Sequence, residues 1–241
     1  MPNVPTIGLI VPPAAGLVPE EGPRMYGASV KFIAAGLGLG WMTPEGYESV
    51  IDRITVLARD LCSRGVNALS IMGTSLTFFK GAAFNQELID SVHRATGLPT
   101  SSMSAGIVEG LCAVGAKRVA VGTAYIDEVN NRLRGFLTES GFEVLALEGL
   151  HLDRIGVAKD VSQDKLQELG ERVFRASPGA DAILISCGGF RTLDLAVPLE
   201  AATGVPVVAS TPAAFRSAVR LVGHSGAVPG FGRLFSEKTA A

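Results

Sequence analysis

Residues 66–72 (VNALSIM) and residues 182–186 (AILIS) are the two segments that decide the fold. Both are short apolar runs of the kind that form buried parallel strands. The first leads into Gly73-Thr74-Ser75 and the second into Cys187-Gly188-Gly189, and a helix-like stretch follows each motif. Parallel α/β sheets place their active sites where strands end and helices begin. We therefore expect an α/β protein whose chemistry lies at the ends of these two strands.

The two halves of the chain resemble a duplication. The sequence Ala95-Thr96-Gly97-Leu98-Pro99 recurs as Ala202-Thr203-Gly204-Val205-Pro206, and the apolar run 6–11 has a counterpart at 118–122. This repeat is too long for a solenoid. It predicts two pseudo-symmetric α/β lobes, each with a central parallel sheet flanked by helices, and an active site between them. The expected lobes are residues 4–115 plus 211–235, and residues 116–210.

Strand and helix patterns alternate along the chain. We expect strands at residues 6–11, 66–72, 99–103, 118–122, 142–147, 182–186 and 205–209. We expect helices at residues 44–64, 82–95, 105–114, 126–139, 163–176, 192–202 and 212–222. Thr43-Pro44 and Thr211-Pro212 each look like an N-cap followed by a first-turn proline. The glycine-rich segment 36–40, with no long strand expected before it, is expected to be a loop that covers the site.

Charge and hydropathy exclude several classes of protein. The net charge is −2 and the pI is near 6.0, so the basic surface typical of nucleic-acid binding is missing. No segment approaches the roughly 20 continuous apolar residues of a membrane span. The first residues, Met1-Pro2-Asn3-Val4-Pro5, do not look like a signal peptide. We expect a cytoplasmic enzyme that acts as a monomer on a small molecule, without nucleic-acid or membrane partners.

Cofactor motifs are also missing from the sequence. The three cysteines show no Cys-x-x-Cys spacing, and the three histidines are scattered, so neither a disulfide framework nor a metal site is expected. Cys62 and Cys112 are expected to be buried packing residues. The glycines form neither a GxGxxG fingerprint nor a P-loop. We expect a protein that uses no cofactor.

One thiol and a group of hydroxyls remain as candidate catalytic groups. Cys187 follows the second strand where Gly73 follows the first, so a carbon held between the lobes would meet a thiol on one side only. Thr74, Ser75 and Tyr125 also follow strands, and the glycines after Cys187 can expose their amides at the start of the next helix. Such donors suit a carboxylate, or the enediolate that forms when the adjacent carbon gains electrons. Each group alone would more often be an N-cap or a buried packing residue.

Several segments resemble the arylmalonate decarboxylase family, within the aspartate/glutamate racemase superfamily. They are residues 11–19 (VPPAAGLVP), 36–40 (GLGLG), 43–47 (TPEGY), 72–76 (MGTSL), 81–85 (GAAFN), 123–127 (TAYID), 186–189 (SCGG) and 230–235 (GFGRLF). The resemblance runs nearly end to end. It implies the two-lobed fold and a cofactor-free decarboxylation of α-disubstituted aryl or alkenyl malonates to chiral 2-substituted acids.

The resemblance also implies roles for individual residues. Thr74, Ser75 and Tyr125, with the amides around Cys187 and Gly188, would hold the retained carboxylate in a dioxyanion hole, and Cys187 would protonate the enediolate. The positions implied around the apolar pocket and the substrate are Pro13, Leu39, Met42, Tyr47, Leu76, Ile155 and Gly189. Trp41 and Met42 are bulkier than the resemblance leads us to expect, so we expect them to narrow the pocket, and Ala158 to restore room.

Two other functions stay open. A racemase or cis–trans isomerase of a small carboxylic or dicarboxylic acid would belong to the same superfamily, but it would need a second cysteine where this chain has Gly73. A non-catalytic carboxylate-binding protein would leave the Cys187 thiol without a use.

Overall fold

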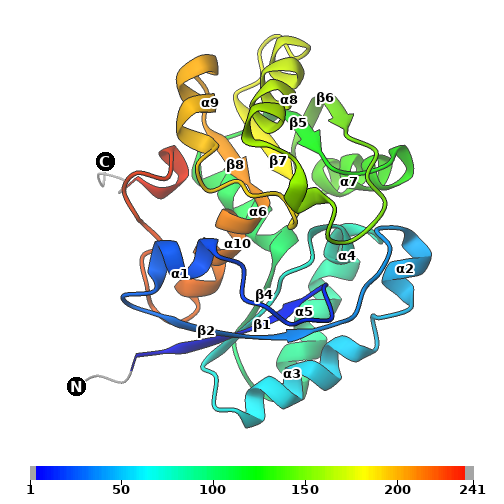
Figure 1. The fold of residues 1–241 in the computed structure, drawn as a ribbon, viewed down its shortest axis with the longest axis vertical. Helices are drawn as coiled ribbons and strands as arrows, with labels where there is room; N and C mark the ends of the chain where they lie inside the picture. Colours follow the sequence, from blue (N-terminus) through cyan, green and yellow to red (C-terminus); the bar gives the residue numbers. More distant parts are fainter. Residues whose placement is uncertain (1–3, 237–241) are drawn as a thin grey trace.

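The computed structural model describes residues 4–236 and contains two four-stranded parallel sheets (Figure 1). The first has the order β2-β1-β3-β4, with β1 (Thr6–Val11), β2 (Lys31–Gly36), β3 (Ala68–Ile71) and β4 (Thr100–Ser102). The second has the order β6-β5-β7-β8, with β5 (Arg118–Thr123), β6 (Glu143–Gly149), β7 (Ala182–Ser186) and β8 (Val207–Ala209). The same strand order in both sheets confirms the expected pair of α/β lobes.

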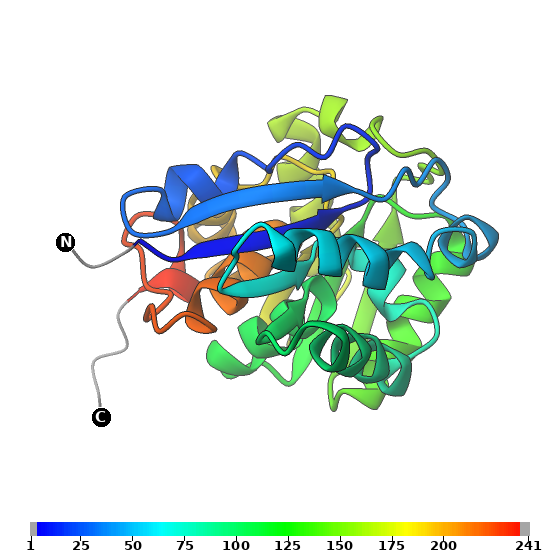
Figure 2. The ribbon, with the colours of Figure 1, turned by 90° about the horizontal axis from the view of Figure 1, so that it is seen from below.

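Helices cover the sheets and also fill the space between them. In the first lobe α3 (Arg53–Ser63) packs on β1 and β2 and α5 (Ala82–Thr96) on β4 (Figure 2), and α1 (Glu21–Tyr26) packs on β2. In the second lobe α7 (Asp127–Glu139) packs along β6, α8 (Gln163–Arg175) along β5, and α9 (Ala196–Thr203) against β8. Two helices, α6 (Met103–Ala113) and α10 (Ser210–Arg220), pack on each other and contact both β4 and β8. They therefore join the lobes, as Figure 1 shows.

The repeated Ala-Thr-Gly-x-Pro sequence has the same structural role in each lobe. Gly97 ends α5 and Gly204 ends α9, both in the left-handed conformation, with φ of 71° and 78°. Their amides donate to the carbonyls of His93 and Glu200, four residues earlier. Glycine adopts this conformation without steric cost, and the proline two residues later cannot continue a helix. The duplicated sequence is therefore a helix-to-strand turn that leads into β4 or β8.

Several sequence expectations in the first lobe are wrong. A strand does precede the glycine-rich segment 36–40, because Gly36 is the last residue of β2. Within residues 4–236 this edge strand pairs with β1 alone, and it contains alanine and glycine, so its sequence pattern is weak. The helix expected at 44–64 is divided by a turn into α2 (Pro44–Glu48) and α3. Thr43 does cap α2, accepting a hydrogen bond from the Gly46 amide at 3.3 Å.

The two halves differ most directly after the central strands. Gly73 is followed at once by α4 (Thr74–Phe78), a short helix that the sequence analysis missed along with α1. After Cys187 the chain instead forms a turn and a loop, and α9 begins only at Ala196, so the helix expected at 192–202 starts later. Thr211 is not an N-cap, because α10 begins one residue earlier, at Ser210.

None of the helices among residues 4–236 has the length and hydropathy needed to cross a bilayer. The division into residues 4–115 plus 211–235 and residues 116–210 stays a prediction, since α10 packs against strands of both sheets.

Candidate active site

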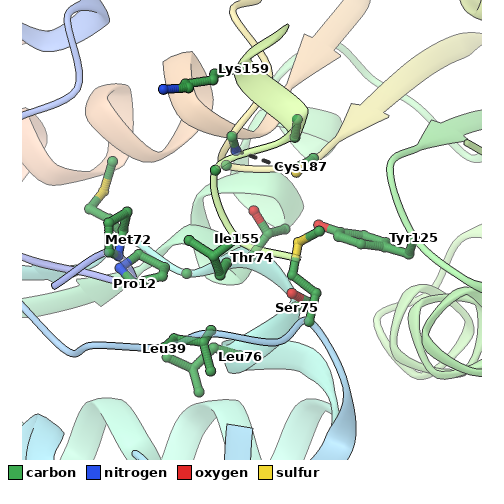
Figure 3. A pocket seen from close by; sticks show the side chains of 17 residues that line it. Pro12, Leu39, Met72, Thr74, Ser75, Leu76, Tyr125, Ile155, Lys159 and Cys187 are labelled. Atoms are coloured by element: carbon green, nitrogen blue, oxygen red, sulfur yellow. Dashed lines mark hydrogen bonds between the residues drawn. The ribbon is translucent and has the colours of Figure 1, made fainter. Parts of the chain in front are cut away.

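A cavity of about 170 Å³ lies between the lobes, where β3, β5 and β7 end (Figure 3). Every residue expected in the site except Tyr47 lines it. From the first lobe come Pro13, Leu39, Met42, Gly73, Thr74, Ser75 and Leu76, and from the second lobe Tyr125, Ile155, Cys187, Gly188 and Gly189. Ala158, which was expected to give the pocket room, lines it as well, and four further lining residues were not expected there: Pro12, Met72, Gly156 and Lys159. Side chains more than a hundred residues apart in sequence therefore meet in one cavity.

Tyr47 lies behind the cavity wall. It is fully buried in α2, with its ring at 5.1 Å from that of Phe79. Its hydroxyl has no hydrogen-bond partner among residues 4–236. Burial raises the pKa of the Tyr47 phenol, and the nearby Ser75 hydroxyl offsets part of this rise. Tyr47 therefore adjoins Ser75 from behind, as a protonated phenol.

The Cys187 thiol is buried, with 3% of the residue exposed. The Gly189 amide donates to Cys187 Sγ at 3.3 Å, the bond drawn dashed in Figure 3. This amide was expected to face the substrate at a helix start, but it turns back onto the sulfur because no helix follows. Burial raises the pKa of the Cys187 thiol to about 11, and the amides of Gly189 and Phe190 offset only part of the rise. The thiol is thus protonated at neutral pH and can act as an acid.

Three residues that carry a hydroxyl line the same cavity. Thr74 and Ser75 occupy the first turn of α4, and Tyr125 follows β5 (Figure 3). The Thr74 hydroxyl donates to Met103 Sδ at 2.6 Å. Burial raises the pKa of the Tyr125 phenol well above its usual value, and the hydroxyls of Ser186 and Thr74 offset only part of the rise. The Tyr125 hydroxyl has no hydrogen-bond partner in the described part of the chain. A buried donor without a partner is costly, so this one is suited to a ligand oxygen.

Polar residues that the sequence analysis missed hold these groups in place. Asn130 Nδ2 donates to the Tyr125 carbonyl at 3.1 Å, and Thr123 Oγ1 accepts from the Tyr125 amide at 3.1 Å. On the other side, Ser104 Oγ donates to the Thr74 carbonyl at 3.0 Å, which ties α4 to α6. The buried Ser186 hydroxyl, next to the thiol, also lacks a partner within residues 4–236. Serine and asparagine have no distinctive spacing here, so only the fold reveals them.

Two loops, one from each lobe, meet beside the cavity. The Met42 amide donates to the Asp153 carbonyl at 2.7 Å, and the Ile155 amide donates to the Gly40 carbonyl at 3.1 Å. Met42 and Ile155 line the cavity with Leu39 and Leu76. These four side chains give the cavity an apolar wall.

Trp41 does not narrow the cavity, contrary to expectation. It forms an antiparallel bridge with Arg154, whose guanidinium carbon lies 4.3 Å from the centre of the indole ring. The residue is 47% exposed. Neighbouring residues of an extended segment point to opposite sides, so Met42 enters the cavity while Trp41 faces outward. Ala158 does line the cavity.

Lys159 is the one cationic residue among the described cavity residues. It is exposed, and in Figure 3 its amine points away from Cys187. Among residues 4–236, no cluster of three or more His, Cys, Asp or Glu side chains is placed to hold a metal ion. The absence of a cofactor stays a prediction.

We expect the Cys187 thiol to react slowly with iodoacetamide at pH 7.5. Its pKa of about 11 leaves little thiolate, and its rate should rise roughly tenfold per pH unit toward that value. Cys112 is exposed, contrary to the expected burial, and serves as an internal control that should react first. Mass spectrometry of the alkylated peptides measures both rates. Faster modification of Cys187 than of Cys112 at pH 7.5 would contradict the assigned protonation state.

Comparison with known proteins identifies a family whose members resemble this chain over nearly its whole length. The family model for arylmalonate decarboxylase matches residues 7–235. The chain is 49% identical over 236 residues to the arylmalonate decarboxylase of Bordetella bronchiseptica, covering 98% of each protein. It is 26% identical over 253 residues to a maleate isomerase of Nocardia farcinica, covering 97% of this chain and 96% of the isomerase.

Solved structures of the same two kinds of enzyme are also similar to this chain. A liganded arylmalonate decarboxylase, in which one glycine is replaced by cysteine and one cysteine by serine, superimposes with a TM-score of 0.94 at 48% identity, covering 97% of this chain and 99% of that one. The maleate isomerase of Pseudomonas putida S16 has a TM-score of 0.89 at 20% identity, with 98% and 99% covered, and shares the fold. The extent of the family match and the near-half identity lead to one conclusion: this chain belongs to the arylmalonate decarboxylase family of carboxy-lyases.

Proposed function

We propose that this enzyme decarboxylates α-disubstituted arylmalonates, or alkenyl analogues, to chiral 2-substituted acids without a cofactor. One observation carries the proposal: a single protonated thiol, Cys187, shares a small cavity with three hydroxyls and an apolar wall. The retained carboxylate of a malonate needs hydrogen-bond donors, whereas the departing carboxylate needs an apolar surrounding. The residues of this cavity suit both needs.

The retained carboxylate would bind at the hydroxyls of Thr74, Ser75 and Tyr125, with the Gly188 amide completing the dioxyanion hole. These residues line a buried space, where electrostatic stabilisation of a developing charge is strongest. The Thr74 hydroxyl, which donates to Met103 Sδ, would turn from that sulfur to the carboxylate. The Tyr125 hydroxyl has no other partner among residues 4–236, so binding an oxygen would satisfy it.

The departing carboxylate would then face Leu39, Met42, Leu76 and Ile155. Carbon dioxide leaves when the bond between the carboxylate and the α-carbon breaks and its electron pair moves to that carbon. The negative charge spreads into the retained carboxylate as an enediolate. An apolar wall offers the localised starting charge no hydrogen bonds, whereas the hydroxyls opposite stabilise the enediolate.

Cys187 would transfer its proton to the α-carbon, forming a carbon–hydrogen bond and leaving a thiolate. The Gly189 amide already donates to this sulfur and would stabilise that thiolate. Because burial gives the thiol a pKa of about 11, the thiolate readily recovers a proton from water before the next turnover.

Gly73 favours the decarboxylase over a racemase or isomerase. It lies two residues after β3 in the first lobe, and Cys187 follows β7 directly in the second, so Cys187 is the one thiol among the described residues that line the cavity. A racemase needs to remove a proton from one face of a carbon and return it to the other, which requires two groups.

A panel of malonates tests the proposal. We expect CO₂ release from 2-aryl-2-methylmalonates, one enantiomer of the product, and no loss of activity after exhaustive chelation and dialysis. Tight binding of these malonates without CO₂ release would support a carboxylate-binding protein instead. Interconversion of maleate and fumarate without decarboxylation would support the isomerase.

Turnover of the same malonates by a Tyr125 variant tests the proposed dioxyanion hole. Tyr125→Phe removes one donor and should lower turnover roughly 10²–10³-fold, the usual effect of losing one such donor. Tyr26→Phe is the matched control, since the Tyr26 hydroxyl is also buried but donates to the Gly226 carbonyl outside the cavity. Equal activity of the two variants would remove Tyr125 from the mechanism.

A further inference from the structure

A second cavity, of about 350 Å³, lies at the C-terminal end of α10. The residues that line it include Arg216 and Arg220 from α10 and Arg233 from the short helix η2 (Arg233–Phe235), together with Ser225 and Ser236. It shares no residue with the reaction cavity. The proposed decarboxylation makes no use of it.

The charge in this cavity is strongly one-sided. Its described lining contains three arginines and no acidic residue, although the whole chain has a net charge of −2. None of the three arginines forms an ion pair within residues 4–236. Glu109 on α6 lies near Arg216, but its carboxylate accepts a hydrogen bond from Ser217 Oγ at 3.1 Å and forms no ion pair with that guanidinium. Glu109 therefore compensates the charge of Arg216 only in part, and no carboxylate lines the described wall of the cavity.

Backbone carbonyls anchor Arg220 and Arg233, which are both exposed. Arg220 Nη1 donates to the Ser225 carbonyl at 3.4 Å, and Arg233 Nη1 donates to the Gly204 carbonyl at 2.9 Å. Arg216 is half-buried, and burial followed by the like charge of Arg220 lowers the pKa of its guanidinium. An anion bound beside these groups would offset both the burial of the Arg216 charge and its repulsion from Arg220.

The loop beside the arginines is preorganised. Tyr26 donates its hydroxyl hydrogen to the Gly226 carbonyl at 2.9 Å, and the Gly226 amide lies 2.9 Å from His224 Nδ1. Gly226 has a φ of 82° and packs against both α10 arginines, where a β-carbon would meet Arg216 Cγ at 2.8 Å. These contacts fix the loop on one side of the cavity, which lowers the entropic cost of binding a ligand there.

We propose that this cavity is a binding site for a phosphate group, either free phosphate or the phosphate of a small phosphomonoester. One planar guanidinium group can donate two parallel hydrogen bonds to the oxygens of a phosphate, and it keeps its positive charge. A tetrahedral phosphate offers oxygens toward three separate arginines, whereas a carboxylate has only two oxygens in one plane. The site is independent of the reaction that the enzyme catalyses.

Isothermal titration calorimetry of the full chain with sodium phosphate, at constant ionic strength, tests the site. Arg216→Gln and Arg233→Gln should each weaken binding about 10- to 100-fold, the expected loss of charge-assisted hydrogen bonds. Arg59→Gln, which changes an exposed arginine of α3, is the matched control and should bind as the unaltered chain does. Both cavity variants should keep normal decarboxylase activity, which also shows that they fold.

Two comparisons make the result specific. Thr74→Ala, in the reaction cavity, should leave phosphate binding unchanged, and acetate should bind far more weakly than phosphate. Phenyl phosphate and inorganic phosphate distinguish the source of the group, and tight binding of either supports the site. The proposal is overturned if the unaltered chain does not bind phosphate, if Arg216→Gln and Arg233→Gln bind it as Arg59→Gln does, or if acetate binds equally well.

Discussion

Cys187→Ala should lower the rate of arylmalonate turnover by roughly 10²–10⁴-fold, the usual contribution of a positioned general acid. The thiol is protonated and is the one thiol among the described residues that line the cavity. Carboxylate binding should survive, since Thr74, Ser75 and Tyr125 are unchanged. The rate of CO₂ release measures turnover, and the affinity for the product acid is measured in a separate binding experiment.

The control for this variant is Cys62→Ala, which removes a partly buried thiol outside the cavity. Both proteins should show similar thermal unfolding, because replacing cysteine by alanine removes only one sulfur atom. Turnover within threefold of the unaltered enzyme would take Cys187 out of the mechanism. A loss of product affinity equal to the loss of rate would indicate a role in binding instead.

Combining Gly73→Cys with Cys187→Ala should invert the handedness of the product. The two positions follow the equivalent strands β3 and β7, and both line the cavity. Gly73 has φ −126° and ψ 100°, an extended conformation open to any residue. The new thiol would therefore approach the α-carbon from the opposite lobe while the proposed dioxyanion hole stays in place. Chiral chromatography of the product measures the outcome.

This double variant should be slow. A β-carbon at Gly73 would meet Leu76 Cβ at 3.0 Å and Pro12 Cγ at 3.3 Å, so the wall has to shift by a few tenths of an ångström. The new thiol would also stand at the N-cap of α4, whereas Cys187 is followed by a turn and a loop, so its surroundings differ from those of Cys187. Gly73→Ala with Cys187→Ala is the matched control, because it adds the same β-carbon without an acid, and it should show no recovery of rate.

The single change Gly73→Cys places a thiol in each lobe and should allow slow racemisation of a 2-aryl acid. Deuterium uptake from D₂O at the α-carbon would follow the proton exchange directly. A double variant whose product has the original handedness would show that these two strand ends do not face each other across the substrate.

Much of the fold could be predicted because its signals are local. The apolar pattern of residues Thr6–Val11 is enough to predict the strand β1. The Ala-Thr-Gly-x-Pro sequence ends a helix at both places where it occurs. These signals depend on near neighbours, and the duplication shows them twice. The edge strand β2 and the short helices α1 and α4 lacked such signals because tertiary packing stabilises them.

The sequence by itself determined which chemical groups are available: one cysteine after a central strand, glycine at the matching position, and hydroxyls after neighbouring strands. Only the tertiary structure decided how they are used. It placed Tyr47 behind the wall and Trp41 outside it, turned the Gly189 amide onto the sulfur, and gathered three arginines around a second cavity. Protonation states and unpaired donors follow from burial. Burial depends on segments far apart in the chain, and no local pattern reports where those segments meet.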